Sequence, residues 1–273
     1  SGIIKLDKHS NLIWANPVRA HHDLQVLPNG DIHVLTRKAR IIPRLNERQP
    51  ILEDFITVLD TNGATLSELS ILECLENSPY FEDFKKRRKR LSGDMMHTNT
   101  LKILDGHLAG DIPAFKKGNY LISLLMVSAV AVVDPGEQAV VWWKTGGFRA
   151  QHEPQILDHS RMLLFDNKGR KGQSAVLELN LLTDELVWQY RGTKEKPFYT
   201  STCGAAWRLP NGNTLIVESD NGRAFEVSRS KEIVWEFMSP HRAGDHSQYV
   251  ATLFDMQRFH PEYTASWIQT GDE

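Results

Sequence analysis

The sequence predicts an all-β fold, a β-propeller of about five four-stranded blades. Two hairpin patterns recur along the 273 residues and alternate with each other, so that one pair of hairpins supplies four strands. The pairs follow one another at roughly 40 to 50 residues, a spacing typical of propeller blades. Hydrophobic residues make up 41% of the chain and charged residues 24%, an ordinary globular balance, so the repeat is the main guide to fold class.

The first pattern is an apolar pair, a short polar turn, two more apolar residues and a tryptophan. Copies that contain the tryptophan occupy residues 3–14, 130–142, 176–188 and 224–235. A fifth copy, at residues 55–69, keeps the turn and lacks the tryptophan. Apolar runs on both sides of such a turn are typical of a β-hairpin. We expect the repeated tryptophans to pack in the core rather than to form a stacking platform for a ligand.

The second pattern precedes four of these hairpins. It has a polar or histidine-containing start, an apolar strand, a turn and a second apolar strand. Its copies begin at His21, His97, Gln151 and Cys203. Leu-Pro-Asn-Gly supplies the turn twice, at residues 27–30 and 209–212, and Asn-Gly is the strongest short signal for a hairpin turn.

The order of the patterns predicts how the ring closes. A lone hairpin comes first, four complete double hairpins follow, and a last strand is expected near residues 249–259. We expect the first hairpin and the last strand to join into a fifth blade, which would remove exposed strand edges. The whole chain, residues 1–273, would then be one domain. A six-bladed ring is the alternative, and a two-sheet sandwich is a weaker third.

Two insertions interrupt the repeat. Residues 38–54, which contain two prolines, are expected to form a loop. Residues 71–91 are expected to form a short helical insertion, capped by Ser70 and interrupted at Pro79.

Partners are limited by charge and hydropathy. The basic run at residues 85–90 (KKRRKR) is interpreted as a solvated helix face, because the formal net charge is −2 and no aromatic residues are interleaved. We therefore expect no nucleic-acid partner. No apolar stretch approaches the roughly 20 residues that cross a bilayer, so no membrane span is expected. Cys74 and Cys203 lie too far apart in sequence to suggest a disulfide framework or a zinc motif.

The histidines at the starts of the predicted first strands are the candidates for chemistry. Aligning these four strands on the last apolar residue of each puts one set of residues at a common level: His22, Asn99, His152 and Gly204. His21 and Gln151 lie one residue earlier in their strands, and His97 lies two residues before Asn99. Because first strands line the central channel of a propeller, separate blades would direct imidazoles toward one axis.

Imidazoles grouped in this way suit two kinds of chemistry. They serve as a nucleophile with acid and base partners, and they also bind metals. The chain has no His-Glu-x-x-His or Cys-x-x-Cys motif, so a metal site is the second choice. It also has no P-loop, dinucleotide fingerprint or Gly-x-Ser-x-Gly motif, and no cofactor is expected.

At these residues the chain resembles the arylsulfotransferase family, bacterial enzymes that move a sulfuryl group between phenols without a nucleotide donor. The resemblance is carried by residues 20–37, 93–104, 148–157 and 207–227. It implies a small-molecule phenolic or sulfated substrate and no cofactor. It also implies a periplasmic or otherwise extracytoplasmic location.

The resemblance implies roles residue by residue. His152 would be the nucleophile that carries the sulfuryl group, and His97 and His22 would be catalytic partners in the channel. The resemblance also implies a substrate contact from Asn99, with His21 beside His22 in the channel. Gln151, Arg149 and Arg37 are further candidates for substrate contacts.

One departure from the family bears on activity. Where the family has an arginine in a Ser-Leu-Arg setting, this chain has Leu125, and Ser128 stands where an asparagine is usual. Loss of a cation that faces the transferring oxygens costs several kcal/mol of barrier. Arg149 and Arg37 are the candidates to replace it.

Three functions follow from these residues. The first is sulfuryl transfer through His152. The second is a non-catalytic ligand-binding propeller that lost the family arginine. The third is a metal-dependent lyase or hydrolase with the channel histidines as ligands.

Overall fold

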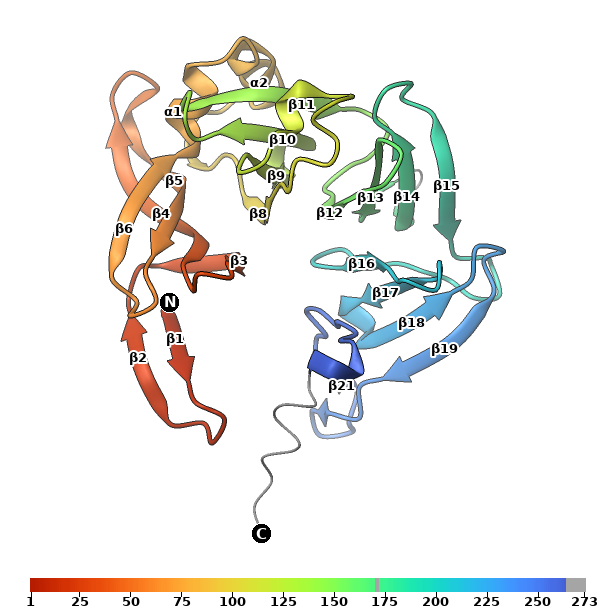
Figure 1. Cartoon of the computed structure of the whole chain (residues 1–273). Helices are drawn as coiled ribbons and strands as arrows, with labels where there is room; N and C mark the ends of the chain where they lie inside the picture. The colour runs from red at the N-terminus through yellow and green to blue at the C-terminus, as the bar shows by residue number, and fades with distance from the viewer. Residues whose placement is uncertain (170–171, 264–273) are drawn as a thin grey trace.

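The computed structural model describes residues 1–169 and 172–263. The protein is all-β with a small helical insertion, and its sheets are arranged like blades around a common centre (Figure 1). Four of the sheets have the predicted antiparallel four-stranded order, with consecutive strands hydrogen-bonded side by side. The strand that comes first in each of these sheets, called here the first strand, lies nearest the centre of the ring (Figure 1).

The four blades follow one another along the chain. The strands of the first are β3 (Ala20–Val26), β4 (Ile32–Ile42), β5 (Asn46–Leu59) and β6 (Thr65–Ser70), with β7 (Gly93–Asp94) added in parallel to β5. The strands of the second are β8 (Thr98–Ile103), β9 (Tyr120–Leu124), β10 (Ala129–Asp134) and β11 (Ala139–Thr145). The strands of the third are β12 (His152–Leu157), β13 (Arg161–Asp166), β14 (Ala175–Asn180) and β15 (Leu186–Arg191). The strands of the fourth are β16 (Ala205–Arg208), β17 (Thr214–Glu218), β18 (Arg223–Val227) and β19 (Ile233–Met238). Short 3₁₀ turns occur at η1 (Pro113–Phe115), η2 (Leu125–Val127) and η4 (Ser219–Asn221).

The predicted loop at residues 38–54 is wrong. β4 and β5 continue as one long hairpin, and their ladder pairs Arg40 with Ile51 and Ile42 with Asn46. The prolines are accommodated because Pro43 lies in the turn, and Pro50 lies beside the register shift between Arg40 and Ile42, where strand pairing is interrupted.

The predicted helical insertion is confirmed as two short helices, α1 (Ile71–Glu76) and α2 (Phe81–Arg87). Ser70 caps α1 as expected, since its hydroxyl accepts a hydrogen bond from the backbone N–H of Glu73 at 3.1 Å. Pro79 lies between the two helices.

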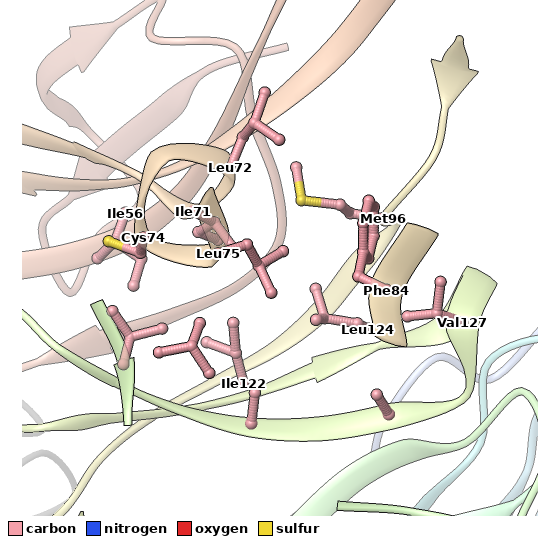
Figure 2. Close-up of a cluster of buried hydrophobic side chains, with 14 of the residues drawn as sticks. Ile56, Ile71, Leu72, Cys74, Leu75, Phe84, Met96, Ile122, Leu124 and Val127 are labelled. Atoms are coloured by element: carbon pink, nitrogen blue, oxygen red, sulfur yellow. The ribbon is translucent and has the colours of Figure 1, made fainter. Parts of the chain in front are cut away.

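These helices bury their apolar faces between the first two blades. The cluster in Figure 2 joins side chains of α1, α2, β5 and β9, among them Ile56, Leu75, Phe84 and Ile122, with Met96 from the segment between β7 and β8. Met96 is fully buried and directly precedes His97, so the packed core fixes the chain where that histidine emerges.

The basic run makes contacts within the chain. Arg87 pairs with Asp83 of the same helix and reaches Thr145. Arg88 donates to the backbone carbonyl of Asp94 at 3.3 Å. The run therefore helps to hold the segment that leads into the second blade.

The two ends of the chain do not join into a fifth blade, contrary to the prediction. The hairpin of β1 (Ile3–Leu6) and β2 (Leu12–Asn16) forms its own sheet, as does the hairpin of β20 (Arg242–Ala243) and β21 (Tyr249–Val250). Within the described residues the ring is therefore open between these two hairpins (Figure 1).

Side-chain packing explains why the ends stay apart. Ile3 packs onto the first blade with Ile32, Val34 and Leu59. The predicted last strand is reduced to the two residues of β21, and the chain beyond it packs Leu253 against the fourth blade instead of pairing with the first hairpin.

The open end of the ring also leaves one of the repeated tryptophans more exposed than predicted. Trp188 is buried, as predicted for the repeat, whereas Trp235 on β19 is 40% exposed because no further blade of the described chain covers it.

Candidate functional site

A pocket of about 460 Å³ opens at the centre of the ring, at the start of the first strands. Its walls include His22, Asn99, His152 and Gly204, one residue from each of the four blades. These are the residues that the alignment of the repeat set at a common level. The repeat therefore predicted which side chains meet, although they are spread over more than half of the sequence.

Three of the first strands carry a bulge where their polar side chains enter the pocket. Pairing shifts register between Ala20 and Leu24 in β3, between Thr98 and Thr100 in β8, and after His152 in β12. His22, His97 and Glu153 have left-handed backbones with φ of 56°, 49° and 49°. Such conformations are strained for residues other than glycine, and bulges re-aim side chains next to functional sites.

His21 and His22 form a chain of ring contacts that begins at Arg37. Arg37 donates a hydrogen bond to Nδ1 of His21 at 3.2 Å, and Nδ1 of His22 lies 2.8 Å from the same atom. Because the Arg37 guanidinium can only donate, Nδ1 of His21 is an acceptor and His22 donates from its own Nδ1. His22 thereby keeps an unprotonated Nε2.

Both of these rings are held neutral. Burial, followed by the charge of Arg37, lowers the pKa of His21 to about 3. Burial, with His97 and Arg37 nearby, lowers the pKa of His22 to about 4. At neutral pH they act as hydrogen-bonding groups rather than as charges.

His97 lies against His22 and is backed by a carboxylate. The two ring centroids are 4.7 Å apart at an interplanar angle of 71°. Nδ1 of His97 lies 2.6 Å from Oδ2 of Asp94. Burial alone would raise the pKa of Asp94, but the hydrogen bond from His97 and the charge of Arg37 outweigh it and the pKa is lowered.

Arg37 connects these groups from outside the pocket wall. Its Nη1 lies 3.6 Å from Asp94, and its Nε lies 3.6 Å from the fully buried Asp54. Burial raises the pKa of Asp54 to about 6, although the backbone N–H of Thr98 donates to its other oxygen at 2.9 Å. Arg37 is thus a cation shared by two groups: it contacts His21 directly, and it lies close to Asp94, the partner of His97.

His152 stands at the first residue of β12 and is backed by an amide. Its Nδ1 lies 2.7 Å from Oδ1 of Asn167. Burial lowers the pKa of His152 to about 4. Next to it, Asn99 donates from Nδ2 to the backbone carbonyl of Gln151 at 2.9 Å, which ties the second and third blades together at the pocket.

Four of the five predicted contact residues lie off the pocket wall, namely His21, Arg37, Gln151 and Arg149, and the predicted catalytic His97 does not line it either. Gln151 is fully buried, and its amide donates to Ser123 at 2.9 Å and to the carbonyl of Ala129 at 2.8 Å, so its side chain is used inside the sheets. The Arg149 side chain is exposed and does not line the pocket. Of the two arginines considered as substitutes for the missing one, only Arg37 contacts the histidines.

The positions that depart from the family pattern have structural roles. Leu125 donates its backbone N–H to the carbonyl of His97 at 3.2 Å. Ser128 accepts from the backbone N–H of Ala150 at 3.2 Å, two residues before His152. Leu125 therefore helps to fix the backbone at His97, and Ser128 helps to fix the backbone just before His152.

Charged residues occupy the remaining wall. Lys102 lies 3.1 Å from Asp23 and 2.5 Å from Glu153, with its Nζ 5.1 Å from the ring centroid of Trp207. Burial raises the pKa of Glu153, against the charge of Lys102. Asp255 of the C-terminal segment accepts from Nε1 of Trp207 at 3.0 Å.

Several of these residues were not singled out from the sequence. Asp94 lies within the Gly-Asp-Met-Met-His motif, and its spacing of three residues before His97 is the signal that could have found it. Asn167 directly follows the apolar strand β13, which is where polar side chains emerge at the ring mouth. Lys102 and Glu153 belong to the first strands β8 and β12, and no motif or spacing in the sequence distinguishes them.

Within residues 1–169 and 172–263, no group of three or more His, Cys, Asp and Glu side chains is arranged to hold a metal ion. In the same part of the chain, no helix is long and apolar enough to cross a membrane. Cys74 and Cys203 are free thiols.

Similar solved structures share the fold at low identity. A protein of unknown function from Bacteroides caccae matches with a TM-score of 0.52 and 14% identity, over 86% of this chain and 74% of that one. Virginiamycin B lyase of Staphylococcus aureus matches with a TM-score of 0.45 and 12% identity, over 82% of this chain and 57% of the lyase. The WD40 β-propeller domain of Doa1 matches with a TM-score of 0.44 and 10% identity, over 80% of this chain and 53% of that chain. At such identities only the first similarity is informative, and it concerns the fold alone.

The sequence itself gives a more specific relationship. A comparison with curated proteins finds no match. The family model described as arylsulfotransferase (ASST), however, matches residues 2–240, which include all four blades and every histidine of the pocket. The chain therefore belongs to the arylsulfotransferase (ASST) family.

Proposed function

We propose that this protein transfers a sulfuryl group from an aryl sulfate to a phenol, with His152 as the nucleophile. The observation that carries the proposal is the neutral His152 imidazole in the wall of the pocket, beside Asn99 and near two further histidines. A neutral imidazole has a free lone pair on one nitrogen and attacks electrophilic sulfur without first losing a proton.

The reaction divides into two half-reactions, and in each of them one bond to sulfur forms while another breaks. The lone pair of His152 forms the N–S bond, and the S–O bond of the donor breaks, so that the phenolate leaves with the electron pair. The acceptor phenol then attacks sulfur through its oxygen, loses its proton, and the electron pair of the N–S bond returns to the ring. The sum is exchange of one phenol for another, with no net change in the protein.

His97 is proposed as the group that moves the proton. Its hydrogen bond to Asp94 fixes one ring nitrogen and stabilises the ring when it is protonated. It then donates to the leaving phenolate in the first half-reaction and accepts from the incoming phenol in the second. His22 has an unprotonated Nε2 and lies against His97, so it is suited to accept hydrogen bonds from the phenol.

Arg37 is proposed to replace the cation that Leu125 does not supply. It contacts His21 and Asp94 and therefore acts on the pocket through these side chains. Because an indirect cation stabilises transferring oxygens less than a direct contact does, we expect slower transfer than in relatives that keep the family arginine.

Intact-protein mass spectrometry tests the proposal. After incubation with 4-nitrophenyl sulfate and removal of excess donor, the protein should carry one added sulfuryl group. His152→Ala should not gain it, whereas His159→Ala, an exposed histidine on the far turn of the same blade, should gain it as the parent does. A parent protein that never gains this mass with any phenolic sulfate would contradict the proposal.

A second candidate is a binding propeller without turnover. Leu125 in place of the family arginine and the exposed side chain of Arg149 favour it. It predicts binding of a phenol in the pocket, measurable by calorimetry, with no labelling of His152 and no release of 4-nitrophenol.

A further inference from the structure

Asn167 stands out because both N–H donors and the carbonyl oxygen of its side chain make hydrogen bonds beside the pocket. Its side chain is fully buried at the end of β13 in the third blade. Nδ2 donates to the backbone carbonyl of Cys203 at 2.6 Å and to that of Thr200 at 3.2 Å. Both carbonyls belong to the segment that leads into the fourth blade, so this amide spans two blades beside the pocket.

The orientation of the amide follows from these partners. An asparagine side chain has two N–H donors, and both are directed to carbonyl oxygens that can only accept. Turning the amide over would set Oδ1 against two carbonyl oxygens, which repel it. Ser174 supports the arrangement, since its hydroxyl donates to the Asn167 backbone carbonyl at 2.9 Å and accepts from the Thr200 N–H at 3.0 Å.

The fixed orientation has a consequence for the neighbouring ring. Oδ1 of Asn167 is an acceptor only, and it lies 2.7 Å from Nδ1 of His152. A hydrogen bond at this distance requires the proton to be on Nδ1. The neutral ring must then leave its lone pair on Nε2.

We propose that Asn167 is the positioning residue of the transfer reaction, which fixes His152 as the Nδ1–H tautomer and so reserves Nε2 for sulfur. The inference rests on the proposed function, in which His152 is the nucleophile. When Nε2 forms its bond to sulfur and the bond from sulfur to the donor oxygen breaks, the Nδ1 proton stays in place. The sulfated ring becomes cationic, and the Asn167 carbonyl oxygen stabilises it through the same hydrogen bond.

An amide suits this task better than a carboxylate. A carboxylate next to Nδ1 favours the doubly protonated ring and would therefore occupy Nε2 with a proton near neutral pH. The groups that face His152 from its neighbours are the rings of His22 and His97. His97 disfavours a positive charge on His152, and Asn167 adds no negative charge. The site thus orients the ring without making it more basic.

The first test reads the tautomer directly and requires no activity. Long-range ¹H–¹⁵N correlation spectra of the protein with labelled histidine, assigned by the loss of signals in His152→Gln, report which nitrogen of His152 carries the proton. We expect the proton on Nδ1 from pH 6 to 8. A proton on Nε2 in the parent protein would overturn the inference.

The second test changes the partner. Asn167→Asp should move the midpoint of His152 protonation, and of His152 labelling by 4-nitrophenyl sulfate, upward by more than one pH unit. Asn167→Leu should mix the two tautomers and lower kcat by about 10- to 100-fold, with KM changed by less than threefold. Asn119→Asp, at another buried asparagine away from the histidines, is the matched control and should leave the pH midpoint unchanged.

These outcomes separate the inference from the proposed function. If the proton is on Nδ1 and Asn167→Asp shifts the midpoint of protonation, while no phenolic sulfate labels the protein, the positioning of His152 stands and sulfuryl transfer fails. If the parent is labelled at His152 and neither Asn167 variant alters the tautomer or the pH midpoint, transfer stands and the positioning role is overturned.

Discussion

His152, which lines the pocket, and His97, which lies against the pocket residue His22, differ in the group behind them. His152 is backed by the neutral amide of Asn167, whereas His97 is backed by the carboxylate of Asp94, which also lies close to Arg37. An amide orients a ring and leaves its proton affinity low, whereas a carboxylate stabilises the protonated ring. Under the proposed function, the ring of His152 would be the one that attacks and the ring of His97 the one that carries a proton.

The difference also explains how one blade pattern supports two roles. Both histidines enter at the start of a first strand, next to a bulge, and the repeat makes these surroundings alike. Their partners come from outside the repeated strand positions, Asp94 from β7 and Asn167 from the turn after β13. The groups that back the two histidines therefore lie outside the repeated strand positions.

The largest expected effect comes from removing the proton carrier while keeping the nucleophile. His97→Gln should still acquire the sulfuryl group from 4-nitrophenyl sulfate, whose phenolate leaves without help, but its turnover with a poor leaving group such as phenyl sulfate should fall by about 10²- to 10⁴-fold. Single-turnover kinetics with both donors measure the contrast. Equal losses with the two donors would mean that the two histidines do not divide the work in this way.

The pH dependence of labelling sharpens the same comparison. Because the pKa of His152 lies at about 4, its Nε2 is free above that value. The rate of labelling should be level above pH 6 and fall about tenfold for each pH unit below 4. Asp94→Asn should leave this profile in place, since Asp94 bonds to the other ring. Quenched-flow labelling from pH 3.5 to 8 provides the measurement, and a profile that shifts in Asp94→Asn would join the two histidines into one titrating unit.

A smaller effect is expected on stability when the shared cation is removed. Arg37→Gln leaves the buried Asp54 without its nearest positive charge, and we expect a loss of about 2 kcal/mol in the free energy of unfolding at pH 8. The pKa of Asp54 is raised to about 6 in the folded state, above the ordinary value near 3.8, so the folded state takes up this proton first as pH falls. Without Arg37 the pKa of Asp54 rises further, so Asp54 of the variant is protonated before Asp54 of the parent as pH falls. The loss should therefore shrink as pH falls from 8 toward 6 and be nearly absent at pH 5.

Urea unfolding at pH 8 and pH 5 checks this expectation. Arg44→Gln is the matched control, because Arg44 forms an ion pair with Glu76 on the surface and such pairs contribute less than about 1 kcal/mol. An Arg37→Gln penalty that is the same at both pH values would show that Asp54 is not the group that feels the missing charge.

The features that could be predicted from the sequence are those that arise from the repeated hairpin patterns or from local contacts. The hairpin patterns predicted the four blades, and their alignment predicted that His22, Asn99, His152 and Gly204 meet, because strand order and side-chain alternation are local and periodic. Ser70 as a helix cap was equally local.

The rest depended on contacts between distant segments. Two prolines predict a loop where β4 and β5 form a long hairpin, because one proline lies in the turn and the other at a register shift. Whether the ring closes depends on how the two ends of the chain pack against the blades. The sequence of either end contains no pattern that predicts this packing. Asn167 and Arg37 are partners of His152 and His21 through contacts between segments well separated in sequence, whereas Asp94 is only three residues from His97.

The open ring affects which part of the molecule unfolds locally at the lowest free energy. The second and third blades each have a blade on both sides, whereas the fourth has a full blade on one side only among the described residues (Figure 1). Amides of β20, β21 and β19 should accordingly exchange with deuterium before those of β9 and β13. Asn167 is held by hydrogen bonds to the carbonyls of Thr200 and Cys203, just before the fourth blade. Local unfolding of that blade would therefore free Asn167 and the His152 ring before the other blades unfold. Loss of chemistry on warming would then precede loss of fold.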